Sequence, residues 1–161
     1  MNMKLKIVAN LFLLLLSLLV SCTPSGKSPP ILLEDKYVNQ QILVRAPNYS
    51  NTYNVGDSIS LELKYNSKYE IVFPNDYNLR IFEDTGDGWV EIKQKPTQRI
   101  PSGDIVLFPT AELPAVQIVI LFPDLPDLQR KYLLRIYVIG QMKIDGDLVK
   151  VAAYTQIALH P

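Results

Sequence analysis

The chain has 161 residues, with 16 Lys and Arg against 16 Asp and Glu, so its formal net charge is zero. This length gives room for one domain, and the scattered basic residues exclude the clustered positive surface that nucleic-acid binding requires. The single cysteine excludes a disulfide within the chain, so we expect a fold that packing alone holds together.

Residues 1–21 have the pattern of a targeting signal. Lys4 and Lys6 form a basic start, the apolar run 7–20 follows, and no acidic residue occurs before Glu34. As a helix, that run would be roughly 21 Å long, short of the roughly 30 Å that a bilayer core requires. A cleaved signal peptide is therefore expected, and a signal-anchor helix with an incidental cysteine is the alternative.

The end of this segment reads Leu19-Val20-Ser21-Cys22. It resembles the lipobox of bacterial lipoproteins, in which a cysteine follows Leu, a small or β-branched residue, and a small residue. The resemblance implies cleavage between Ser21 and Cys22, a thioether-linked diacylglyceryl group on Cys22, and acylation of the new amino terminus. Two or three acyl chains suffice for stable membrane anchoring. It further implies a lipid anchor in the cell membrane or outer membrane, with the domain on the extracytoplasmic side.

Residues 22–36 follow as the lipidated cysteine and a flexible linker rich in Pro, Ser and Gly. In extended polyproline geometry such a linker spans up to roughly 40 Å. Removal of Lys4 and Lys6 with the signal leaves 14 basic and 16 acidic residues, a net charge of −2. Thr23, in place of the aspartate that retains some lipoproteins in the inner membrane, favours the outer membrane where a cell has two.

The remaining residues, 37–161, are predicted to form one all-β domain. Apolar residues recur with a period of two, and turn residues and prolines separate the runs. The predicted strands cover 41–46, 57–65, 70–73, 78–83, 89–94, 104–108, 115–122, 131–140 and 148–159. No run has a helical period free of proline, although 125–131 could form a single turn. Seven to nine short strands indicate an antiparallel sandwich.

The last two strands are expected to pair as one long hairpin. Asp145-Gly146 suits a tight primed turn, so residues 131–144 would pair with 147–159. Both faces of the first arm are apolar, so one face is either covered by the domain or exposed to a partner. The interpretation as a partner surface points to Leu133, Tyr137, Ile139 and Tyr154.

Several segments together resemble bacterial immunoglobulin-like or fibronectin-III-like modules. These are the strand from Tyr53 to Ser67, the runs at 77–82 and 86–89, Leu113-Pro114-Ala115, and the run from Tyr132 to Gly140. The chain is also distantly similar to the BsuPI-type proteinase-inhibitor domain, whose Trp-rich strand corresponds here to Trp89 alone. The resemblance implies an immunoglobulin-like β-sandwich of 7–9 strands.

The sequence lacks the residues that most enzyme classes need. His160 is the only imidazole, and the chain has no Gly-x-Ser-x-Gly, Walker or dinucleotide-binding motif. Glu83, Asp84, Asp87 and Glu91 cluster around one turn, but their spacing is not that of a calcium loop. A solvated hairpin turn is the preferred interpretation, and we expect no catalytic activity, cofactor or metal.

The sequence therefore predicts a membrane-anchored envelope lipoprotein with a non-catalytic domain for protein–protein interaction, as an accessory or assembly component. A glycan- or peptidoglycan-binding module is the alternative, because tyrosine-rich loops suit ring stacking. A proteinase-inhibitor-like domain and an enzyme that uses acidic residues alone are weaker alternatives.

Overall fold

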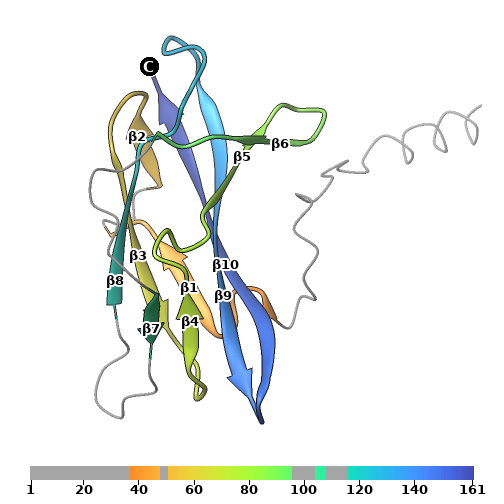
Figure 1. Cartoon of the computed structure of the whole chain (residues 1–161). Helices are drawn as coiled ribbons and strands as arrows, with labels where there is room; N and C mark the ends of the chain where they lie inside the picture. The colour runs from red at the N-terminus through yellow and green to blue at the C-terminus, as the bar shows by residue number, and fades with distance from the viewer. Residues whose placement is uncertain (1–36, 48–50, 96–103, 108–115) are drawn as a thin grey trace, which may run out of the picture.

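The computed structural model describes residues 37–47, 51–95, 104–107 and 116–161, which form ten β-strands in two sheets (Figure 1). No α-helix occurs in these ranges. The predicted all-β sandwich is therefore confirmed. The signal peptide, Cys22 and the linker 22–36 lie outside the described residues.

The smaller sheet has three antiparallel strands in the order β1-β3-β8. They are β1 (Ile42–Arg45), β3 (Ile59–Tyr65) and β8 (Val116–Leu121). In β3 the apolar residues at alternate positions are buried and the polar ones between them are half-buried. The period of two in the sequence is thus one buried face of a strand.

The larger sheet has seven strands, with β9 and β10 as its longest. Its main path runs β2-β10-β9-β4-β7, while β5 pairs with both β9 and β6. The strands are β2 (Thr52–Asn54), β4 (Ile71–Phe73), β5 (Arg80–Asp84), β6 (Trp89–Ile92), β7 (Ile105–Leu107), β9 (Tyr132–Ile144) and β10 (Asp147–His160).

The predicted long hairpin is confirmed. β9 and β10 pair without interruption from Ile144↔Asp147 to Tyr132↔Leu159. Asp145 and Gly146 both have positive φ, 49° and 96°, as the primed turn requires. The hairpin spans the length of the sandwich in Figure 1.

The core lies between the two sheets and draws on both. Ile59, Leu61 and Leu63 of β3 are fully buried, as are Leu134 and Ile136 of β9. With a single cysteine the chain has no internal disulfide, so these buried apolar side chains hold the two sheets together.

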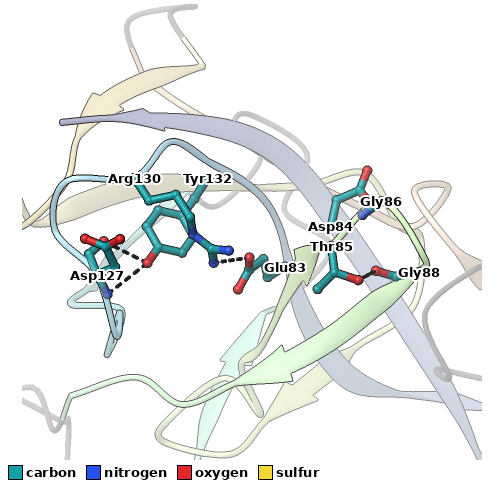
Figure 2. A network of polar contacts seen from close by, with 8 residues as sticks. All are labelled: Glu83, Asp84, Thr85, Gly86, Gly88, Asp127, Arg130 and Tyr132. Carbon is teal, nitrogen blue, oxygen red and sulfur yellow. Dashed lines mark hydrogen bonds and ion pairs between the residues drawn. The ribbon is translucent and has the colours of Figure 1, made fainter.

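The two sheets form the two layers of a β-sandwich, with β1-β3-β8 in one layer and β10, β9, β4 and β5 among the strands of the other. A tyrosine joins the start of β9 to the loop before it, a contact called the tyrosine corner below (Figure 2). The Tyr132 hydroxyl accepts a hydrogen bond from the Asp127 backbone N–H at 3.0 Å and donates one to the Asp127 carbonyl at 2.8 Å. Leu134, two residues further along β9, is fully buried.

Three details differ from the prediction. β2 was not predicted, because its three residues show no buried alternation and its partner β10 is about a hundred residues away. β2 and the Val38 bridge run parallel to β10, so the sheet is mixed. Residues 125–131 contain a turn at 128–129 and no helical turn.

Candidate functional site

The candidate site is the outer face of the larger sheet, the face that points away from the smaller sheet. Strand alternation places Tyr132, Leu134 and Ile136 of β9 in the core, so the residues between them lie on the outer face. The pairing of β9 with β10 and β5 adds further residues to this face, because directly opposed residues share a side of the sheet.

Aromatic side chains from four strands gather on this outer face. Phe82, Tyr137 and Ala152 form a second buried cluster, and Trp89 and Tyr154 pack against it. The rings of Phe82 and Tyr137 meet edge to face, with centroids 5.7 Å apart, and those of Tyr137 and Tyr154 are 5.1 Å apart. These five residues together with Ile139, which also packs there, are called the aromatic cluster below.

Arg135 lies between two of these rings. Its guanidinium carbon is 4.2 Å from the centroid of Trp89 and 4.8 Å from that of Tyr154. Stacking on both rings fixes the guanidinium plane, and each such contact contributes about 0.5–2 kcal/mol depending on how far it is desolvated.

The charge of Arg135 has no counter-ion among the residues that the structure describes. Its guanidinium donates a weak hydrogen bond to Gln156 at 3.4 Å and interacts with the Tyr137 hydroxyl, and its buried Nε has no acceptor within the described chain. A positive charge that is oriented but unpaired is suited to meet a negative group on a partner.

Burial and pairing change the titration of two groups on this face. Burial raises the pKa of the Tyr137 hydroxyl, so Tyr137 stays neutral at physiological pH. The hydrogen bonds from Arg80 lower the pKa of Glu91, so this carboxylate stays charged and Arg80 is neutralised locally. Arg135 stacks on the aromatic cluster and, unlike Arg80, forms no ion pair within the described residues.

The predicted partner surface is only partly accessible. Leu133, Ile139 and Tyr154 lie half-buried on the outer face, whereas Tyr137 is only 6 % exposed because Phe82 of β5 covers it. The sequence did not point to Phe82, Trp89 and Arg135 as neighbours of these residues. The signals present were the lone tryptophan and an arginine at an outward position of an apolar strand.

Two hollows are present in the described part of the chain. The first, of about 130 Å³, adjoins the aromatic cluster at Ile139 and is lined there by Val72, Gln141 and Lys150. The second, of about 500 Å³, lies along Leu79, Ile92 and Gln94. Only the first shares a residue with the aromatic cluster, so it belongs to the same candidate site.

The carboxylates around the β5–β6 turn have different partners, and two of them, Glu83 and Asp84, are drawn in Figure 2. Glu83 is buried and pairs with Arg130, Asp84 accepts a hydrogen bond from the Gly86 N–H at 2.9 Å, and Glu91 pairs with Arg80. No group of three potential metal ligands occurs in the described ranges. A hydrogen bond from the Thr85 N–H to the Gly88 carbonyl closes the turn. Acidic residues are common in such hairpin turns, which explains their presence here.

The other predicted site residues lie elsewhere. His160 is at the end of β10, where its carbonyl accepts a hydrogen bond from the Val55 N–H. Ser21 and Cys22 lie outside the described residues. Within the described part of the chain, no helix has the length and apolar character to cross a membrane.

No protein-family model, no curated protein and no solved structure matches the chain. The fold is a β-sandwich whose larger sheet carries aromatic residues on its outer face, together with an arginine that forms no ion pair among the described residues.

Proposed function

We propose that this chain is a lipid-anchored, non-catalytic protein of the cell envelope whose outer face binds a partner protein. The observation that carries the proposal is the stacking of Arg135 between Trp89 and Tyr154 within the aromatic cluster. Tryptophan, tyrosine and arginine are the residues that most often dominate the energy of protein interfaces. A guanidinium that two rings already orient loses little conformational entropy when it binds.

The lipid anchor is supported by the four residues Leu19-Val20-Ser21-Cys22. Acyl chains on Cys22 would hold the chain at the bilayer, and the linker 22–36 would let the domain reach roughly 40 Å from it. Labelling of cells with a clickable fatty acid tests this part. We expect label on the intact chain and none on the Cys22→Ala variant, and equal incorporation into both would contradict the anchor.

Purification from detergent-solubilised membranes tests the binding face. We expect the intact chain to retain a protein partner in stoichiometric amount, and Trp89→Ala and Arg135→Lys to reduce its recovery at least fivefold. Lys64→Ala, on the smaller sheet, is the matched control and should change nothing. Unfolding curves of each variant separate a lost contact from a lost fold. Recovery of the same partner with all variants would show that it binds elsewhere.

A glycan- or peptidoglycan-binding module is the second candidate, since sugars stack on exposed Trp and Tyr rings. Arg135 already covers one face of the Trp89 ring and one of the Tyr154 ring, which favours a protein partner over a sugar. Retention of the chain on cell-wall polysaccharide, without a protein partner, would reverse this preference.

A further inference from the structure

Besides the outer face, the edge of β10 that faces away from β9 is a second candidate binding surface, next to the β9–β10 turn. The pairing with β9 is continuous, and the pair Ile144↔Asp147 closes the two-residue turn. Odd-numbered residues of β10 therefore bond to β9, and even-numbered residues direct their N–H and C=O groups to the other edge. Bonds of Ala152, Ala158 and His160 to the N-terminal part of the domain confirm this parity.

The outer edge of β10 is covered along only part of its length. Asn39 bonds to the backbone of Ala152 and Tyr154, and β2 covers residues 158–160. Leu148 and Lys150 point their backbone groups to the same edge, and neither has a backbone partner there among the residues described. The Leu148 side chain is 63 % exposed, the largest fraction among the exposed large apolar residues of the described chain. An open edge of this kind is a template for another strand.

On the outer face, the charged side chains of β9 and β10 are of one sign, whereas Asp145 and Asp147 lie in and after the turn and Asp104 lines the same hollow as Lys150. Every charged side chain that β9 and β10 place on the outer face is a cation: Arg135, Lys143 and Lys150. None of the three forms an ion pair within the described residues. The mature sequence has the opposite balance, with 14 basic and 16 acidic residues after removal of Lys4 and Lys6, so the cations reflect this surface in particular.

A second copy of the chain fits this edge less well. Its β10 would bring another Lys150 to the same short edge, and like charges on neighbouring strands disfavour the pairing.

We propose that the edge of β10 at Leu148 and Lys150 takes up an extended segment of the partner protein, with a carboxylate beside Lys150 and an apolar side chain beside Leu148. The added strand would bond to the outward N–H and C=O groups of these two residues. The lysines would supply its specificity and a faster, salt-dependent association. This inference rests on the proposed function only in taking the partner to be a protein.

Fluorescence anisotropy with labelled synthetic peptides tests the inference on the full chain in detergent micelles. The probe is a seven-residue peptide in which glutamate alternates with valine, and the comparison peptides replace glutamate by lysine or place proline at the centre. We expect at least tenfold tighter binding of the glutamate peptide than of either comparison. Hydrogen–deuterium exchange should show slower exchange at Leu148 and Lys150 when it binds.

Two variants and a control locate the site. Lys150→Glu should reverse the preference from the glutamate to the lysine peptide, and Lys64→Glu, the same charge change on the smaller sheet, should leave it unchanged. Leu148→Pro removes the exposed leucine side chain and an outward N–H that bonds to no backbone group of the described residues, and should weaken binding of the glutamate peptide at least tenfold without altering the unfolding curve.

Several results would overturn the inference. They are failure of the glutamate peptide to bind, an unchanged preference in Lys150→Glu, and a dimer in sedimentation that Leu148→Pro converts to monomer. If the glutamate peptide does not bind but Trp89→Ala still reduces partner recovery from membranes, only the proposal for the β10 edge is refuted. If the peptide does not bind and Trp89→Ala leaves partner recovery unchanged, the proposed function is refuted as well.

Discussion

The tyrosine corner offers the sharpest test of how the domain is held together. Tyr132 is only 3 % exposed, and its hydroxyl joins the start of β9 to the preceding loop through two hydrogen bonds to the Asp127 backbone. Tyr132→Phe removes both bonds and keeps the ring. Each bond contributes about 0.5–1.5 kcal/mol, and water reaches the exposed Asp127 in the variant, so we expect a loss of about 1–2 kcal/mol.

Urea unfolding followed by tryptophan fluorescence measures this loss, and Trp89 is the only tryptophan. For a domain of this size the melting temperature should fall by about 3–8 °C. Tyr154→Phe is the matched control, because no hydrogen bond joins the Tyr154 hydroxyl to the described residues. A loss below about 0.5 kcal/mol, or one no larger than that of Tyr154→Phe, would refute the role given to the corner.

Three further predictions concern the core, the hairpin turn and high pH. In Gly140→Ala the new Cβ would lie 2.7 Å from Cε1 of the fully buried Phe73. We therefore expect the free energy of unfolding in urea to fall by about 1–3 kcal/mol, and a fall under about 0.5 kcal/mol would contradict this packing. Gly146→Ala forces an L-residue to φ near +96° and should cost about 1–2 kcal/mol by the same assay, whereas an unchanged midpoint would contradict the primed turn. Burial raises the pKa of Tyr53, Tyr77 and Tyr137 above the value of about 10 that they have in the unfolded chain. The stability that these three residues contribute is therefore present below pH 10 and is lost as the pH rises through the raised pKa values. Absorbance at 295 nm should then show some tyrosines ionising late, together with unfolding, and ionisation of all nine together near pH 10 would be the contrary result.

Local pattern was enough to predict most of the fold. β3 and the β9–β10 hairpin follow from alternation and from Asp145-Gly146, because each signal lies within a few residues of the structure that it specifies. β2 could not be predicted in this way, since Thr52–Asn54 becomes a strand only through its pairing with distant residues of β10.

The candidate site could be predicted only in part, for the same reason. Alternation places Leu133, Ile139 and Tyr154 on one face of β9 and β10, and the structure leaves them half-buried on the outer face. The burial of Tyr137 depends on Phe82, and the stacking of Arg135 depends on Trp89, and both contacts arise because β5 pairs with β9 and β6 with β5. The sequence contains these residues but does not show which strands are neighbours.

Photo-crosslinking in living cells tests most directly whether the outer face binds a partner. A photo-reactive amino acid at Gln156, an exposed residue opposite Arg135, probes the face, and one at Ile120, 48 % exposed on the smaller sheet, is the control. We predict one discrete crosslinked protein from position 156, lost when Trp89→Ala is added, and none from position 120. Equal crosslinking from both positions, or a product from 156 that Trp89→Ala does not reduce, would contradict the proposal.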